Sequence, residues 1–465
     1  MADGARFEGD IQLEPPTVKS PETVPAAEDH AYLAFIVSAL IIAIAGGFLL
    51  AILLPLAETG LFGWSERVPQ LIQAHGWAQL QGWAGLFVAG MSTRLIPRFA
   101  GRPGVRRNVI LPILAALAPS VVIRTVVEPF VGGRLGDVLT VVAGILGGLG
   151  MLGVWALLSV TLAKGRKRRE PWRYFAWAGA SWWAVWAAFT VGAALKSIGN
   201  DRYVPASLDD ALTWIVIFGC VGNFVFGVQS RSVPVFFGRK TPTVKRVLIP
   251  GLMLNAGPLL VALSLLPLRG ALSFRLEGGG LAIAGLAAAW LAPIAGSVHG
   301  TAHRLRPRSR AASRYVLGAN IATIAGGLCL AWAGLHTLAS GGYEAYAFRD
   351  AARHAFGIGM ITMLAFGMAQ LIAPVFALSR AEARPPGLAE RLPFWLLVAA
   401  VILRMLTGLL ADHAALDVRM RTAAVAGALA WLALVLFATT VMRAIRNEPR
   451  MKELLAGMVH GGGEQ

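Results

Sequence analysis

Charge and cysteine are both scarce in this sequence. Only 14% of the 465 residues are charged, whereas 56% are hydrophobic. The two cysteines, Cys220 and Cys329, lie inside apolar stretches, so they are too few and too deep to form the disulfide framework of a small secreted domain. The N-terminal stretch lacks the apolar core of a signal peptide, which predicts a short disordered cytoplasmic tail over residues 1–29.

Long apolar runs make up most of the remaining chain. Windows of about 20 or more apolar residues recur, and each is long enough to cross the roughly 30 Å hydrocarbon layer of a bilayer. We count twelve such spans, separated by polar or proline- and glycine-containing loops. The sequence therefore predicts an all-α polytopic protein of the lipid bilayer, with one twelve-helix membrane domain over residues 30–445 and a cytoplasmic tail over residues 446–465.

Positive charge is concentrated in particular loops. The net charge is +17, and most of the 42 Lys and Arg residues lie in the two tails or in loops after even-numbered spans, such as 164–173, 238–246 and 303–314. Cytoplasmic loops of membrane proteins are enriched in Lys and Arg, so this pattern predicts that both termini lie in the cytoplasm. Topology explains the charge, and no nucleic-acid partner is expected.

One short motif occurs three times in the chain. The segments GMSTRLIPRFAGR at 90–102, GVQSRSVPVFFGR at 227–239 and GMAQLIAPVFALSR at 367–380 share Gly, Pro and Phe at the same positions, with offsets of 137 and 140 residues. Chance matches in a glycine-rich membrane protein are the alternative to a true repeat. The offsets correspond to about four spans and predict three pseudo-symmetric units of four helices, at about residues 30–165, 172–303 and 313–445.

Three units of four helices predict a pseudo-threefold ring with spans 2, 6 and 10 at its centre. This arrangement resembles the catalytic subunit of haem-copper oxidases. The resemblance implies that histidines on these central helices hold haem and copper near the outer face.

Two histidines are placed at similar depth in the first and third units. His75 and His354 both lie near the outer start of a central helix. Two neutral imidazoles on facing helices are the axial ligands that a six-coordinate haem iron needs. Gly82 and Gly357 would let a flat macrocycle or a neighbouring helix approach closely. The alternative for each histidine is a capping or interfacial role.

Four further residues are candidates for the same region. His336 and His413, at outer ends of spans 9 and 11, are additional candidate metal ligands. Arg124 and Arg404 lie inside spans, where an ionised side chain is costly and usually functional. A guanidinium binds a carboxylate bidentately, so haem propionates are one candidate partner. An internal ion pair, for example of Arg124 with Glu128, is the other.

The whole chain resembles the NnrS family, the haem- and copper-containing membrane proteins linked to the nitric oxide response in bacteria. The matching residues are His75, Gly82, Gly90, Pro97, Gly101 and Arg102 in the first segment, Gly227, Arg231, Pro234 and Phe236 in the second, and His354, Met360 and Met363 in the third. The resemblance implies a bacterial cytoplasmic (inner) membrane protein that binds haem and interacts with nitric oxide or a redox partner.

The chain departs from the family in its first segment. His75 is followed by Gly, Trp and Ala, whereas the family has His-x-His-Glu, so copper is doubtful. The middle unit has no histidine between Leu212 and Lys240, which argues against a dinuclear oxygen- or nitric-oxide-reducing centre. The sequence contains no nucleophile with a base at a plausible spacing, so nothing in it indicates an enzyme. The second hypothesis is a cofactor-free transporter or accessory scaffold that binds an anionic substrate through Arg124 and Arg404.

Overall fold

The computed structural model describes residues 30–166, 169–268, 271–298, 307–341, 345–376, 387–411 and 413–461, and every statement below concerns these residues. The predicted tail over residues 1–29 lies outside them. The described residues are overwhelmingly helical and contain no strand. Eleven of the helices are long and apolar enough to cross a membrane. The prediction of an all-α, polytopic membrane protein is therefore confirmed.

Twelve long helices follow one another in the described residues, and four of them contain a short π-helical segment. The four interrupted helices are α1–η1–α2 (Tyr32–Ile42, Ala43–Gly47, Phe48–Glu58), α3–η4–α4 (Val68–Trp77, Ala78–Gly85, Leu86–Phe99), α8–η5–α9 (Ala206–Trp214, Ile215–Gly222, Asn223–Phe236) and α13–η7–α14 (Tyr346–His354, Ala355–Thr362, Met363–Phe376). The others are α5 (Arg107–Phe130), α6 (Gly133–Lys164), α7 (Pro171–Ser197), α10 (Val244–Leu263), α11 (Leu272–Ala295), α12 (Pro307–Ser340), α15 (Leu388–Leu409) and α16 (Leu416–Gly461). Two short 3₁₀ turns, η2 (Leu61–Gly63) and η3 (Ser65–Arg67), connect α2 to α3.

The helix over residues 68–99 is the one of these twelve that is not among the eleven apolar candidates. It is long enough to span a bilayer at 1.5 Å per residue, but it carries several polar side chains. Two of them are buried and bonded to neighbouring segments. Gln73 exchanges hydrogen bonds with the backbone of Val204, at 2.7 and 2.9 Å, and Gln81 donates to the Ser120 hydroxyl at 3.1 Å. The polarity of this helix therefore serves contacts inside the protein.

The three long π-helical segments η4, η5 and η7 occur at corresponding points. Each has eight residues, and their first residues are separated by the same offsets, 137 and 140, as the sequence motif. The three segments also contact one another. We call the helices that contain them, over residues 68–99, 206–236 and 346–376, the inner helices. The twelve spans and their three units stay predictions, which this correspondence supports.

A glycine in each inner helix packs against the first helix of its own unit. Small residues at such contacts let helix backbones approach closely in a membrane. An added Cβ would lie 2.6, 3.1 and 2.6 Å from its aromatic neighbour in the pairs Gly90 with Phe35, Gly227 with Phe175 and Gly367 with Tyr315. The three glycines, which the sequence motif aligned, therefore make equivalent contacts.

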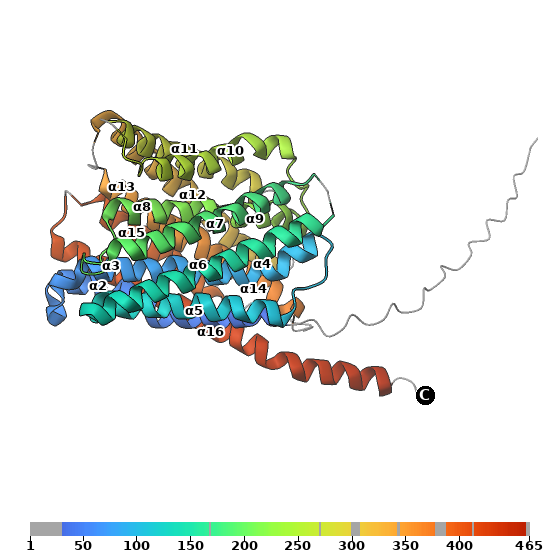
Figure 1. Cartoon of the computed structure of the whole chain (residues 1–465). Helices are drawn as coiled ribbons and strands as arrows, with labels where there is room; N and C mark the ends of the chain where they lie inside the picture. Colours follow the sequence, from blue (N-terminus) through green and yellow to red (C-terminus); the bar gives the residue numbers. More distant parts are fainter. Residues whose placement is uncertain are drawn as a thin grey trace, which may run out of the picture.

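The bundle has two distinct ends along the inner helices. Figure 1 shows α3, α8 and α13 at one end and α4, α9 and α14 at the other. The last helix, α16, packs along α2, so the first and last helices of the chain are neighbours. Its C-terminal part continues beyond the bundle as far as Gly461 (Figure 1). This extension includes residues 446–461 of the predicted tail.

Candidate functional site

A cavity of about 210 Å³, with several charged side chains in its wall, lies at the end of the bundle where the inner helices begin. Side chains from all three inner helices and from α2, α15 and α16 line it. We call it the histidine cavity. Its histidine and charged lining residues are His75, His354, Glu58, Asp209, Asp350, Arg353 and Arg404.

The histidine cavity is asymmetric although it lies where the inner helices face one another. Gly76, Thr213 and Arg353 all line it, and these residues are separated by the offsets of the repeat. At this position the first unit thus contributes only the hydrogen atom of Gly76, the second the hydroxyl group of Thr213, and the third the guanidinium group of Arg353. Different side chains at corresponding positions give the cavity a chemically distinct side in each unit.

His75 is half-buried and points toward the cavity from α3. Its Nδ1 lies 2.9 Å from the carbonyl oxygen of Gly47, the last residue of the π-helical segment η1. A histidine that ligates a metal commonly uses one ring nitrogen for such a backbone bond, which fixes the tautomer and leaves the other nitrogen for the metal. The contact with Gly47 therefore holds the ring by Nδ1 and leaves Nε2 for the cavity.

His354 has a comparable arrangement on the facing inner helix. Its Nδ1 lies 2.8 Å from the carbonyl oxygen of Asp350 and 3.4 Å from the Asp350 carboxylate. Arg404 donates to the two oxygens of the same carboxylate, at 2.7 and 3.3 Å. Asp350 thus contacts both residues: its backbone carbonyl orients the His354 imidazole, and its carboxylate balances the charge of the Arg404 guanidinium.

The two histidines do not occupy corresponding positions in their units. His354 directly precedes η7, and the residues that directly precede η4 and η5 are Trp77 and Trp214. His75 lies two residues before Trp77. Both histidines line the cavity, but they come from positions of the repeat that are not equivalent.

Of the two candidate glycines, only Gly357 borders the cavity. An added Cβ at Gly357 would meet nothing within 4 Å, and the same holds for Gly76. These positions leave open space in the cavity wall. Gly82 instead packs against the first helix, because an added Cβ would lie 2.5 Å from Ile42. We expected these glycines to allow close approach of either a macrocycle or a neighbouring helix, and Gly82 allows that of a helix.

Arg124 lies away from the histidine cavity and is almost completely buried. It contacts Glu128 four residues later, with Nη2 3.4 Å from the carboxylate oxygens. Its guanidinium also lies over the ring of Trp77, 4.1 Å from the centroid, which adds a cation–π attraction. The structure thus brings Arg404 to the cavity and gives Arg124 the internal ion pair.

The two further histidines are not brought to the cavity either. His336 is half-buried in α12, and His413 is exposed between α15 and α16. Neither of them lines the cavity that holds His75 and His354. Within the described ranges, no group of three or more His, Cys, Asp or Glu side chains is arranged to hold a metal ion.

A buried ionic network beside the cavity was not among the candidates from the sequence. Arg349 donates to Asp210 at 2.9 Å, to Glu277 at 2.5 Å and to the Thr337 hydroxyl at 2.9 Å. Arg353, which lines the cavity, also pairs with Asp210. The signal was present in the sequence, because charges inside apolar windows are rare and are usually paired. The network joins two inner helices to α11 and α12.

Comparison with known proteins does not assign a function to this cavity. No protein family matches the chain, and no curated protein matches it.

Proposed function

We propose that this chain is an NnrS-like haem protein of the bacterial cytoplasmic membrane, with His75 and His354 as the axial ligands. One observation carries the proposal. Both imidazoles line one cavity from facing helices, and each has its Nδ1 at a backbone carbonyl oxygen. In each histidine the backbone contact leaves Nε2 as the nitrogen that could bind an iron, and a six-coordinate haem needs two such nitrogens. The expected separation of about 4 Å between these nitrogens follows from metal–nitrogen bonds of about 2 Å.

Two glycines and two arginines of the cavity suit a flat group with carboxylates, while Glu58, Asp209 and Asp350 add three carboxylates to the same wall. Gly76 and Gly357 leave space in the wall, and Arg353 and Arg404 provide guanidinium groups for propionates. Both arginines also contact carboxylates of the protein, so their positions do not depend on a bound group. Bound haem would supply an iron that exchanges single electrons, which suits a role in the nitric oxide response or in electron handling. The protein would contribute the ligands and their orientation.

The basic loops support an orientation with both termini in the cytoplasm. This orientation puts the histidine cavity near the outer face of the membrane. The alternative function, a transporter or scaffold that binds an anion through Arg124 and Arg404, has less support. Arg124 does not line the cavity that Arg404 lines, so the two arginines do not share one site. Copper has little support, because His75 is followed by Gly, Trp and Ala where the NnrS family has His-x-His-Glu.

The test is a reduced-minus-oxidised optical spectrum of the purified protein. We expect a low-spin haem signal in the unaltered protein, and its loss in His75→Ala and in His354→Ala, because each variant removes one axial ligand. His413→Ala is the matched control, since His413 is exposed and lies away from the cavity. A protein that is folded and purified from haem-replete cells but lacks the signal would overturn the proposal.

A further inference from the structure

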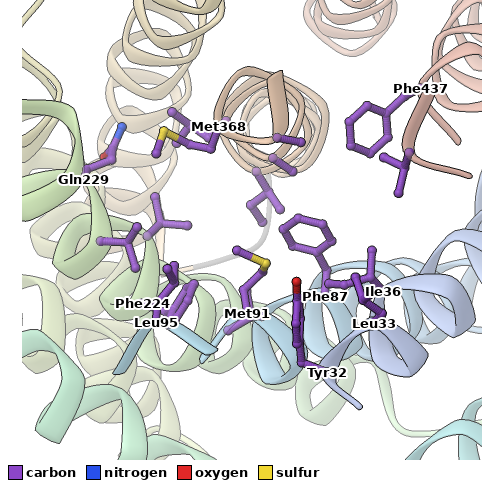
Figure 2. A pocket seen from close by; sticks show the side chains of 18 of the residues that line it. Tyr32, Leu33, Ile36, Phe87, Met91, Leu95, Phe224, Gln229, Met368 and Phe437 are labelled. Atoms are coloured by element: carbon purple, nitrogen blue, oxygen red, sulfur yellow. The ribbon is translucent and has the colours of Figure 1, made fainter. Parts of the chain in front are cut away.

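A second cavity lies along the same inner helices, on the other side of the π-helical segments. Its volume is about 140 Å³, and its wall is almost entirely apolar. Figure 2 shows Phe87, Met91 and Phe437 around this space, which is bounded by α1, α4, α9, α14 and α16. We call it the apolar cavity. Gln229 and the Tyr32 hydroxyl are the main polar groups near it.

The apolar cavity also lies where the three inner helices face one another. Met91, Val228 and Met368 all line it, and they are separated by the offsets 137 and 140 of the repeat. The histidine cavity has the same relation to the repeat, as Gly76, Thr213 and Arg353 show. The two cavities therefore follow one another along the centre of the bundle.

One residue belongs to both walls. Ile361, in η7, lines the histidine cavity and the apolar cavity, and its side chain is buried. Across from it, Trp83 lines the histidine cavity and Phe87 lines the apolar cavity, with their rings 5.2 Å apart. The Trp83 Nε1 donates to the Thr362 hydroxyl at 3.0 Å, which holds the indole in place. Ile361 and this aromatic pair form the boundary between the cavities.

The size and chemistry of the apolar cavity select its ligand. A cavity of about 150 Å³ lined by aliphatic and aromatic side chains stays dry and takes up xenon or another small apolar molecule. An ion would lose its hydration without charged partners, so the lining excludes it. The apolar cavity is partly open, and two of the helices that line it, α1 and α16, expose apolar side chains such as Ile41 and Leu432 on the outside of the bundle, where a membrane protein meets the bilayer. Small apolar molecules dissolve in that surrounding medium.

We propose that the apolar cavity binds small uncharged apolar molecules, of the size of xenon or a diatomic gas, and supplies them to the histidine cavity past Ile361. The binding site stands on the geometry of the apolar cavity alone. The supply step rests on the proposed haem function, because it names the class of substrate that would reach a haem in the histidine cavity. Aliphatic Ile361 can change rotamer, whereas the indole of Trp83 is fixed by its hydrogen bond, so the passage opens on the Ile361 side.

Xenon tests the binding site without any dependence on haem. In crystals of the purified protein under xenon pressure, we expect xenon density beside Met91. Met91→Trp fills the space and should abolish that density. Val425→Trp is the control, because Val425 is exposed on the outer face of α16. An apolar cavity without xenon in the unaltered protein would overturn the binding site, whether or not haem is present.

Re-oxidation of the reduced haem by dissolved oxygen tests the supply step. Ile361→Trp should slow the reaction on the order of tenfold, and Ile361→Ala should accelerate it. Ile402→Trp, an exposed position on α15, should leave the rate unchanged. Equal rates in all four proteins would overturn the supply step. A protein that binds xenon but contains no haem would overturn the proposed function and the supply step, and would support the binding site.

Discussion

At the residue scale, one substitution between units gives the site its chemistry. The residue before the π-helical segment is Trp77 in the first unit, Trp214 in the second and His354 in the third. An indole has one nitrogen, which acts only as a donor, whereas a neutral imidazole has a donor and an acceptor. Only the third unit therefore presents a possible metal ligand at this position.

The buried network around Arg349 leads to a prediction about stability. Arg349→Met removes the cation that Asp210 and Glu277 share, and Asp210 keeps its pair with Arg353. Breaking the buried pair with Glu277 in this way costs roughly 3–5 kcal/mol. We expect a large fall in the thermal midpoint. The reaction of buried Cys220 with a thiol-reactive fluorophore during heating measures it.

Arg421→Met provides the comparison for this change. Arg421 pairs with Asp417 at 3.0 Å on the exposed surface, where an ion pair contributes about 1 kcal/mol or less. The midpoint of this variant should stay close to that of the unaltered protein. Similar midpoints for Arg349→Met and Arg421→Met would show that the network does not stabilise the fold.

At the element scale, glycines set how closely the inner helices approach their neighbours. We predict that Gly90→Ala destabilises the protein by about 1–3 kcal/mol, because the added methyl group would meet the Phe35 Cβ and the Tyr32 carbonyl oxygen. Gly279→Ala should be neutral or slightly stabilising, since Gly279 lies in α11 with nothing within 4 Å of the added group and alanine favours a helix. The same thermal measurement compares the two. A Gly90→Ala protein as stable as Gly279→Ala would contradict the close packing.

The sequence allowed the helices to be predicted, but not the π-helical segments within them. Apolar run lengths predicted the helices, because crossing a bilayer imposes a minimum length. The glycines Gly82, Gly219 and Gly359 also share the repeat offsets, and each packs against the first helix of its unit. Their π-helical surroundings could not be predicted, since the backbone bonding that distinguishes a π turn from an α turn has no simple residue pattern.

The candidate site was predictable only in part, for a related reason. His75, His354, Arg404 and Gly357 line one cavity, and all four were candidates from the sequence. Charges inside apolar stretches indicate that Arg349 needs partners, but its ion pairs join residues 139 and 72 positions apart, so no local pattern reveals which residues these partners are. The apolar cavity was equally hidden, because its lining consists of ordinary apolar residues whose convergence depends on the packing of five helices.

At the scale of the whole molecule, the orientation in the membrane is open to a direct test. In a variant without Cys220 and Cys329, we introduce Glu66→Cys in the loop after the first helix or Lys240→Cys in the loop after the sixth. Both positions are exposed. The positive-inside rule predicts that a membrane-impermeant maleimide labels the first from outside intact cells, and the second only after permeabilisation. Labelling of both from one side would contradict the twelve-span topology.

The contact between α16 and α2 joins the two ends of the membrane domain. An added Cβ at Gly427 would lie 2.5 Å from the Ala51 carbonyl oxygen, and the Trp431 Nε1 donates to the Ile44 carbonyl oxygen at 3.0 Å. Gly427 and Ala51 also form part of the wall of the histidine cavity. The ribosome delivers the helices in chain order, so this wall is the last to be completed. Until α16 has inserted, the histidine cavity lacks the part of its wall that Gly427 supplies, so a ligand added before that step would meet a wider entrance than the folded bundle offers.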